Sequence, residues 1–360
     1  MKSHQYVLIM AGGVGARFWP ASREQRPKQF LDITGTGRSL LRSTFERCAQ
    51  IVPPGQIYIV TNASYAAQVA KHLPELKPEQ IFMEPSRNNT APCVAYASLK
   101  LAKRDPQGVC LVAPSDHLIG DEEAYVSTVR RAMEYAAQHR VLITLGMTPT
   151  RPDTGYGYIH YEKQAIADRV HPVKRFTEKP DLAVAQQFVA SGDYLWNSGM
   201  FIWSLDAVLD AYARYASTTY EILKAGVPHY FTDREPAFLA DQYPRTEKTS
   251  VDYAILEQAD NVCVVPAEFG WSDLGTWNSL YEKMEKDGNG NVRVHQPVVS
   301  YQCSNTLVHT IDGKLVVTAG LKDFVVVAED DVVLVFPRHR EQEIKELRKQ
   351  IAARGLDQYL

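Results

Sequence analysis

The sequence predicts an α/β fold, in which a mostly parallel, mixed sheet carries helices on both faces and a smaller β-rich domain follows. Short apolar runs alternate along the first part of the chain with stretches of helical periodicity. This alternation is typical of βαβ units. Beyond residue 287 the pattern changes to short apolar runs with turns roughly every ten residues, which indicates β structure. We therefore predict one domain over 1–287 and a second over 288–360, closed by an amphipathic helix.

The expected elements of the first domain follow in chain order. Strands are predicted where apolar runs are short and end in polar or glycine-rich loops, at 6–10, 57–61, 80–83, 109–113, 141–145, 154–159, 173–176, 196–203 and 263–266. Helices are predicted where apolar residues recur at three- and four-residue spacing, at 39–52, 63–73, 93–103, 122–138, 181–189 and 206–212. Asp181 has the side chain expected of a helix N-cap.

The expected elements of the second domain are short strands and one helix. The strands are predicted at 298–299, 306–309, 315–317, 324–327 and 332–336, and the helix at 340–353.

Composition limits the classes of function. The 360 residues are 45% hydrophobic and 22% charged with a net charge of −3, which argues against a general binder of nucleic acid or of a membrane surface. The five cysteines are widely spaced without a Cys-x-x-Cys pair, which favours reduced thiols over disulfides or a zinc site. The short apolar run at the N-terminus meets glycines, so that no signal peptide is expected, and no run approaches the ~20 apolar residues of a membrane span. A cytoplasmic protein is expected.

A glycine loop follows the first strand directly, and its members are Ala11, Gly12, Gly13 and Gly15. Glycines let the backbone turn tightly and point amide hydrogens at a ligand. Arg17 adds a planar guanidinium and Lys28 a compact ammonium. Together they indicate a polyphosphate-binding loop, with an ordinary glycine turn as the alternative.

Two better-known glycine motifs do not fit this loop. The dinucleotide fingerprint Gly-x-Gly-x-x-Gly fails because Phe18 stands where its third glycine would be, counted from Gly13. The P-loop fails because the segment ends in Gly-Ala-Arg instead of Gly-Lys-Ser/Thr. Pro20 also prevents an immediate long helix.

Three polar loops are expected at one edge of the sheet, because ligands bind beyond the carboxyl ends of parallel strands. They are the glycine loop, the segment 84–92 and the segment 114–117. Asp116 follows its strand directly, and Asp273 lies in a glycine-flanked turn between tryptophans. Two carboxylates beside a phosphate site would suit Mg²⁺, although each could instead be a turn or cap residue.

The motif Gly-Gly-x-Gly-x-Arg followed by Pro-Lys-Gln-Phe resembles the opening of the sugar-1-phosphate nucleotidylyltransferases. The Trp-Pro-x-Ser-Arg insert resembles the mannose-1-phosphate guanylyltransferase branch of that family. The resemblance implies a Rossmann-like, nucleotide-diphospho-sugar transferase fold. It also implies that the glycines, Arg17 and Lys28 hold the nucleotide's phosphates, and that Asp116 and Asp273 bind the catalytic Mg²⁺.

Two further motifs concern the sugar. A carboxylate at Glu178 can accept sugar hydroxyl groups and the ammonium of Lys179 can meet a phosphate, although a solvated charge pair is the commoner meaning of Glu-Lys. The Phe-x-Glu-Lys-Pro motif and Asn197 in Trp-Asn-Ser-Gly resemble the family's sugar-phosphate site. Gly155 and Gly157 would let the backbone approach the sugar, or are simple bend glycines.

The base is expected at the 84–92 segment, which resembles the guanine loop of the guanylyltransferase branch. Guanine differs from uracil and thymine in its O6 acceptor and its N1–H and N2–H donors. Pro85, Ser86, Asn88, Asn89 and backbone groups are the candidates, and the sequence does not say which atoms read the base.

The residues include no histidine triad, metal-binding histidine cluster or nucleophile elbow. A sugar 1-phosphate is already close to dianionic at neutral pH, so that it needs no general base to attack a phosphorus. The resemblance implies that GTP and α-D-mannose 1-phosphate give GDP-mannose and pyrophosphate. The alternatives are a uridylyl- or thymidylyltransferase acting on glucose 1-phosphate, and a non-catalytic paralogue that binds a nucleotide sugar.

The β-rich tail resembles the family's partial left-handed β-helix, which implies a homodimer. Many bacterial relatives carry an added isomerase domain, and this sequence ends at Leu360 without one. A monofunctional enzyme is therefore expected.

Overall fold

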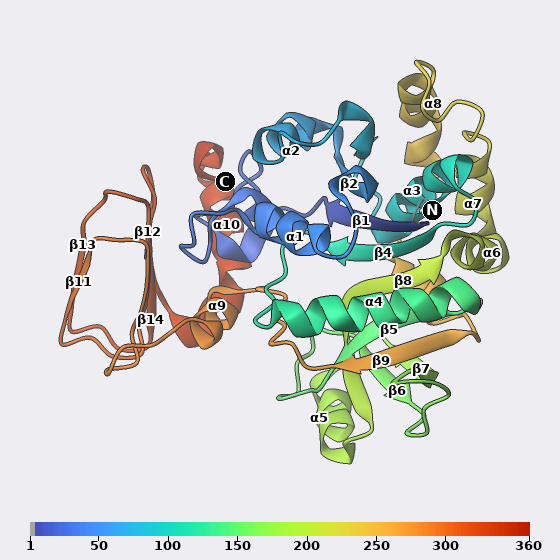
Figure 1. Ribbon diagram of the computed structural model, residues 1–360. Coiled ribbons are helices and arrows are strands. Elements are labelled where there is room, and N and C mark those ends of the chain that lie inside the picture. The colour runs from blue at the N-terminus through green and yellow to red at the C-terminus, as the bar shows by residue number, and fades with distance from the viewer. Residues whose placement is uncertain (1–3) are drawn as a thin grey trace. The chain divides into compact units, whose positions relative to one another are not determined.

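A computed structural model describes residues 4–360 (Figure 1). The chain forms two compact units, which we describe separately. The sheet unit contains the chain up to Gly12 together with 45–115 and 119–271. The β-helix unit contains 13–44, 116–118 and 272–360. Within residues 4–360, no helix combines the length and the apolar character that crossing a membrane requires.

The sheet unit is built on a nine-stranded mixed sheet. Its strands, in spatial order, are β3 (Ile81–Glu84), β2 (Ile57–Asn62), β1 (Gln5–Ala11), β4 (Val109–Pro114), β8 (Tyr194–Ser204), β5 (Leu142–Met147), β9 (Val262–Ala267), β7 (His171–Thr177) and β6 (Tyr158–Tyr161). The strands from β3 to β4 are mutually parallel, and β5 is parallel to β9. Strand β8 runs antiparallel between β4 and β5. The mixed, mostly parallel sheet predicted from the alternating pattern is confirmed.

Apolar runs explain why these segments are central strands. Val7, Leu8 and Ile9 are completely buried, so that side chains on both faces of β1 are covered. The helices between residues 40 and 242 are α1 (Leu40–Ala49), α2 (Ala66–His72), α3 (Thr90–Arg104), α4 (Glu122–Gln138), α5 (Leu182–Ser191), α6 (Leu205–Tyr215), α7 (Ser217–Lys224) and α8 (Glu235–Gln242). Figure 1 shows α4 lying along the sheet, where it contacts β4, β8, β5 and β9.

Side-chain caps fix where three of these helices begin. Asn89 accepts a hydrogen bond from the Thr90 amide at α3, and Asp121 accepts one from the Ala124 amide at α4. Asp181 accepts one from the Val184 amide and begins α5. The N-cap predicted at Asp181 is therefore confirmed.

The β-helix unit winds its strands into stacked parallel ladders. Strands β10 (Val292–Val294), β12 (Leu307–Thr310) and β14 (Phe324–Ala328) form one ladder, which β15 (Val333–Pro337) continues antiparallel. Strands β11 (Val298–Tyr301) and β13 (Val316–Ala319) form the other. The chain visits the two ladders in turn, which is the connectivity of a coil. The prediction of a β-rich C-terminal part is confirmed.

Two helices complete the β-helix unit, α9 (Trp277–Lys283) and α10 (Ile344–Ala353). Residues 13–44 share a hydrophobic core with them: Phe18 and Trp19 belong to the same buried cluster as Trp277, Val325 and Ile344. For this reason each compact unit is made of segments that are not consecutive in the sequence. The domain boundary near residue 288 stays a prediction.

Several elements differ from the expected ones. Helix α10 begins at Ile344, because residues 338–343 form a 3-10 turn instead of its first turn. Helices α7 and α8 were not predicted. They lie between predicted elements in a segment with many aromatic residues, where Leu223 and Leu239 join the buried core.

Candidate functional site

The glycine loop packs directly on Lys28 within the β-helix unit. Gly15 has a φ angle of +73°, and a Cβ atom placed there would lie 2.5 Å from the Cβ of Lys28. A side chain at position 15 would therefore be both strained and in collision. The Lys28 amide donates a hydrogen bond to the Val14 carbonyl over 3.1 Å, which fixes the lysine against the loop.

Lys28 brings two predicted site residues together. Its side chain is only 3% exposed, and its Nζ donates to Asp116 Oδ2 over 2.9 Å and to the Asp273 carbonyl over 2.7 Å. The three residues are far apart in the sequence. Their meeting agrees with the expectation that Lys28, Asp116 and Asp273 share one location.

An antiparallel bridge holds the two aspartate segments side by side. The Leu118 amide donates to the Ser272 carbonyl over 2.8 Å, and the Ser272 amide donates back to the Leu118 carbonyl over 3.0 Å. The Gly275 amide donates to Asp273 Oδ1 over 3.0 Å. A Cβ at Gly275 would come within 2.6 Å of Asp273 Oδ2, so that glycine is needed there to leave room for the carboxylate.

The electrostatics of this cluster favour an ionised Asp116. Burial acts to raise the pKa of this carboxyl group, but the charges of Lys28 and His117 and the hydrogen bond from Lys28 outweigh burial. The net result is a pKa below the ordinary value of an aspartate. Asp116 is therefore a carboxylate at neutral pH.

Asp116 and Asp273 fit the requirements of a magnesium ion that is shared with a phosphate ligand. Mg²⁺ commonly uses one or two protein carboxylates and completes its octahedron with phosphate oxygens and water. Among residues 4–360, no three His, Cys, Asp or Glu side chains form a metal-binding group by themselves. Two carboxylates with oxygen donors are consistent with a metal that needs the substrate to complete its coordination.

Arg17 lies in the short 3-10 helix Ala16–Phe18 that follows the glycine loop. Its Nε is buried and has no hydrogen-bond partner within the described chain. A buried guanidinium nitrogen without a partner is costly unless a ligand supplies the acceptor. The Nε atoms of Arg338 and Arg348 are likewise buried without a hydrogen-bond partner in the described chain, and the phosphate-binding role of Arg17 stays a prediction.

A second cluster lies in the sheet unit, at the end of β7 and along β8. Asn197 donates through Nδ2 to Asp252 Oδ1 over 2.7 Å, and its Oδ1 accepts from Thr144 Oγ1 over 3.0 Å. Lys179 forms an ion pair with Glu178 Oε1. The structure therefore gathers three of the predicted sugar-binding residues and adds Asp252, which the sequence analysis missed.

One oxygen of Glu178 is left without a partner. Glu178 Oε2 is buried and accepts no hydrogen bond from any described residue. A Cβ at Gly157 would come within 2.3 Å of this same oxygen, so that only glycine permits its position. The cluster thus presents a carboxylate oxygen that is ready to accept a hydrogen bond from a ligand.

Gly155 is the remaining predicted glycine of this region, and its amide forms a hydrogen bond within a turn. The Gly155 amide donates to Asp153 Oδ1 over 2.8 Å, which closes a tight turn. The substrate-binding role of Gly155 stays a prediction. The ring of Tyr156 packs edge-on against Trp196 with centroids 5.0 Å apart, and lies 5.4 Å from that of Trp271.

The carboxylate of Glu178 is close enough to affect the pKa of Asp252. Burial and the neighbouring carboxylate of Glu178 raise the pKa of Asp252 to about 6, against the opposing effect of the hydrogen bond from Asn197. A nearby cation or hydroxyl donor would therefore stabilise the pair. A ligand with several hydroxyl groups provides such donors.

The predicted base loop is held by Asn88. This side chain is 1% exposed, and its Nδ2 donates to the Tyr243 carbonyl over 3.0 Å and to Thr246 Oγ1 over 3.0 Å. Ser86 Oγ donates to Asn88 Oδ1 over 3.1 Å. The Asn88 amide group is thus used within the protein, and it shapes the loop that carries Pro85 and Ser86.

Glu84, at the end of β3, is the other residue that the sequence analysis missed. Its carboxylate is 7% exposed, accepts a hydrogen bond from the Tyr243 hydroxyl, and has Oε2 4.0 Å from a Cβ placed at Gly12. Burial raises its pKa to about 7, although hydrogen bonds from Tyr243 and Cys93 oppose the shift. Glu84 therefore lies between the first glycine of the loop and the predicted base loop.

The raised pKa of Glu84 predicts a pH dependence of stability. The folded protein holds this proton more tightly than the unfolded chain, so that the group destabilises the fold as pH rises from about 4.5 to 7. The Glu84→Gln variant should lack this slope. Urea unfolding of both proteins from pH 4.5 to 8 should show their difference in unfolding free energy changing by about 3 kcal/mol. A difference that is independent of pH would show that Glu84 is ionised normally.

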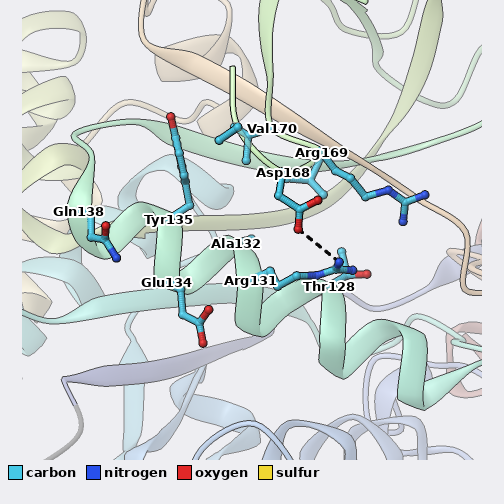
Figure 2. A pocket seen from close by; sticks show the side chains of 11 residues that line it. Thr128, Arg131, Ala132, Glu134, Tyr135, Gln138, Asp168, Arg169 and Val170 are labelled. Atoms are coloured by element: carbon cyan, nitrogen blue, oxygen red, sulfur yellow. Dashed lines mark hydrogen bonds and ion pairs between the residues drawn. The ribbon is translucent and has the colours of Figure 1, made fainter. Parts of the chain in front are cut away.

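A hollow elsewhere on the sheet unit does not coincide with any predicted site residue. It has a volume of about 220 Å³ and lies between α4 and the turn at 167–170. Figure 2 shows Arg131 of α4 facing Asp168, with Tyr135 and Arg169 nearby. Both members of this ion pair are largely exposed, at 46% and 70%. Opposite charges that satisfy each other in solvent give no indication of a ligand.

Comparison with known proteins identifies the family. Residues 6–290 match the nucleotidyl transferase family, and residues 296–351 match the MannoseP isomerase/GMP-like beta-helix domain. The xanthan biosynthesis protein XanB of Xanthomonas campestris is 39% identical over 97% of this chain and 73% of its own length. The mannose-1-phosphate guanylyltransferase of Escherichia coli K12 is 36% identical over 98% of this chain and 75% of its own.

A solved structure agrees along nearly the whole chain. It is described as a mannose-1-phosphate geranyltransferase from Thermus thermophilus, with 32% identity and a TM-score of 0.88. The similarity covers 97% of this chain and 100% of that one. The described strands, the glycine loop with Lys28 and the family matches lead to one conclusion: this chain belongs to the nucleotidyl transferase family and carries that family's β-helix domain.

Proposed function

We propose that the protein transfers GMP from GTP to α-D-mannose 1-phosphate, which gives GDP-mannose and pyrophosphate, with Mg²⁺ as cofactor. The observation that carries this proposal is the near-full-length similarity to the Escherichia coli mannose-1-phosphate guanylyltransferase. The two side-chain clusters supply groups of the required chemistry. Homodimer formation and a cytoplasmic location remain predictions.

The phosphate groups are assigned to the glycine loop and the cluster around Lys28. The amides of Ala11, Gly12, Gly13 and Gly15 would donate to phosphate oxygens, and Arg17 would supply a guanidinium with a buried, unpaired nitrogen. Lys28 would place its ammonium beside the reacting phosphate, where negative charge increases in the transition state.

Asp116 and Asp273 would hold the magnesium ion, which when bound neutralises phosphate charge and aligns phosphate oxygens. No residue needs to act as a general base. The attacking sugar phosphate is already charged, so that the protein's task is to orient it and to screen repulsion between two anions. Lys28 and Lys179 are the cations that the proposal assigns to this screening.

The sugar is assigned to the cluster of Glu178, Asn197 and Asp252. The unpartnered Glu178 Oε2 would accept one sugar hydroxyl, and Asp252, oriented by Asn197, would accept another. Lys179 would leave its ion pair with Glu178 to meet the sugar phosphate. Gly157 leaves the space that this arrangement needs.

The base is assigned to the loop that begins at Glu84. Guanine presents two neighbouring donors, N1–H and N2–H, which a carboxylate accepts together. Glu84 is the buried carboxylate at this loop, while Pro85 and Ser86 offer backbone groups. Uracil and thymine have no second donor beside N3–H, and would make one hydrogen bond fewer with this carboxylate.

Replacing Glu178 should separate sugar binding from nucleotide binding. For Glu178→Gln, which keeps the size of the side chain, the KM for mannose 1-phosphate should rise roughly ten- to hundredfold, because a charged acceptor of hydroxyl groups is lost. The KM for GTP should change less than threefold. The exposed Glu162→Gln serves as the matched control. An unchanged sugar KM would remove Glu178 from the sugar site.

The proposed reaction is tested by identifying its products. Purified protein with GTP, mannose 1-phosphate and magnesium should form GDP-mannose and pyrophosphate in equal amounts, which phosphorus NMR resolves. Addition of EDTA should stop the reaction, and excess magnesium should restore it. Hydrolysis of GTP without formation of a sugar nucleotide would contradict the proposal.

A further inference from the structure

The first turn of the C-terminal helix α10 lies against the short helix that carries Arg17. Both belong to the β-helix unit, and the two helices are in contact. Ile344, at the start of α10, is 1% exposed and belongs to the same hydrophobic cluster as Phe18. The position of this turn beside Arg17 is therefore fixed by the core.

Lys345, the next residue of α10, is exposed and differs from three charged side chains near it in the sequence. Lys349 pairs with Glu346 over 2.9 Å, Arg340 with Glu343 over 2.6 Å, and Arg338 with Glu282 over 3.3 Å. Within residues 4–360, Lys345 forms no ion pair or hydrogen bond, and neither does the guanidinium of Arg17. Two cations thus lie near each other, neither paired with a carboxylate.

The charge of Arg17 affects the pKa of Lys345. The positive charge of Arg17 is the largest influence on Lys345 and, together with burial, lowers the pKa of its ammonium. Two positive charges that interact in this way repel one another, so that the arrangement costs free energy in the absence of an anion. A shared anion would remove that cost and would be held by both.

The charge of Arg17 also acts on one buried carboxylate, Glu341, whose pKa burial raises and Arg17 helps to lower. Glu341 is 8% exposed, and its Oε2 accepts a hydrogen bond from the Asn278 amide over 2.5 Å at the first turn of α9. Glu341 therefore acts as a hydrogen-bond acceptor at the start of α9. In the described part of the chain it forms no ion pair with either cation.

We propose that Lys345 is a further phosphate-contacting residue, which with Arg17 holds the β- and γ-phosphates of the nucleotide and then the pyrophosphate that leaves. Lys28 is bonded to Asp116 and to the Asp273 carbonyl, where the reacting phosphate is assigned. The leaving end carries several negative charges, and Arg17 alone would neutralise only one. The β-helix domain thereby contributes a cation to the reaction. The inference rests on nucleotidyl transfer, and not on the identity of the base or sugar.

Calorimetric titration with inorganic pyrophosphate and magnesium tests the assignment on the full chain. The Kd of Lys345→Ala should be roughly tenfold higher than that of the wild type, as expected for the loss of one charge-assisted contact. Lys345→Arg should restore binding. Lys349→Ala, one turn further along α10 and 75% exposed in its side chain, is the matched control and should bind normally.

Kinetics separate a contact with phosphate from a merely structural role. In the reverse reaction, Lys345→Ala should raise the KM for pyrophosphate while leaving the KM for the sugar nucleotide within twofold. The thermal midpoint should match that of Lys349→Ala. Equal pyrophosphate affinity in both variants would overturn the assignment. A failure of GTP or mannose 1-phosphate as substrates, with pyrophosphate binding still dependent on Lys345, would refute the proposed specificity and leave the inference standing.

Discussion

Replacement of Lys28 by methionine is expected to lower kcat by two to three orders of magnitude, the effect typical of losing a preorganised charge beside a reacting phosphate. Methionine keeps most of the apolar stem that lies beside Gly15, but it loses the ammonium that lies 5.5 Å from the centroid of the Phe18 ring. The ammonium that contacts Asp116 and the Asp273 carbonyl is lost. Initial rates of pyrophosphate release at saturating substrate measure the loss.

Two controls show that the effect of Lys28→Met is chemical. Lys349→Met changes the same residue type on the exposed face of α10 and should keep full activity. Circular dichroism should show that the Lys28 variant stays folded at the assay temperature, although a buried carboxylate partner loses its cation and some stability. A kcat within threefold of the wild-type value would eliminate Lys28 as a catalytic residue.

The Asp273→Asn variant should lose about three orders of magnitude in turnover. Asparagine keeps an oxygen for the Gly275 amide, which donates over 3.0 Å, and it fits the space that Gly275 provides. The negative charge that would hold magnesium is removed. A magnesium titration of the residual activity should show half-saturation at a concentration at least tenfold higher than that of the wild type.

Asp330→Asn is the control for this prediction, because Asp330 belongs to the same unit and its side chain is 85% exposed. It should leave both turnover and magnesium dependence unchanged. If Asp273→Asn lost turnover but kept the wild-type magnesium dependence, Asp273 would not be a metal ligand. Its role would then be to shape the turn that offers its carbonyl to Lys28.

The sequence was sufficient to predict those strands and loops whose position and chemical role follow from a local pattern of residues. Short apolar runs followed by glycine or polar residues marked β1 and β4 and the loops that follow them. Because parallel strands deliver their carboxyl ends to one edge, the strand pattern alone predicted that Asp116 lies next to the phosphate loop. The contacts of Lys28 with Asp116 and with the Asp273 backbone agree with that argument.

Other features depend on contacts that no local pattern encodes. Asp252 lies in a π-helical segment, Asp252–Leu256, that follows no predicted strand, and only folding brings it to Asn197. Glu84 was predicted as the first residue of the polar segment 84–92, and its unusual pKa arises from burial beside Tyr243 at the end of β3. A carboxylate shows its environment only when the surrounding side chains are in place.

Residues 13–44 group with the C-terminal part of the chain because of contacts that, again, no local pattern encodes. The ring of Phe18 packs at a tilt against that of Trp277 with centroids 4.8 Å apart, although the two residues are far apart in the sequence. Aromatic residues predict burial, but they do not predict the partner against which they are buried. For this reason neither the units of the fold nor the position of α10 beside Arg17 could be inferred from periodicity.

The central claim concerns specificity, and one substrate grid tests it directly. Pyrophosphate release should be measured in magnesium buffer with GTP, UTP, dTTP and ATP, each paired with mannose 1-phosphate and with glucose 1-phosphate. We predict release confined to GTP with mannose 1-phosphate, as the Glu84 loop and the sugar cluster require. A preference for UTP or dTTP with glucose 1-phosphate would contradict that assignment, and no release with any pair from folded, nucleotide-binding protein would favour a non-catalytic sensor.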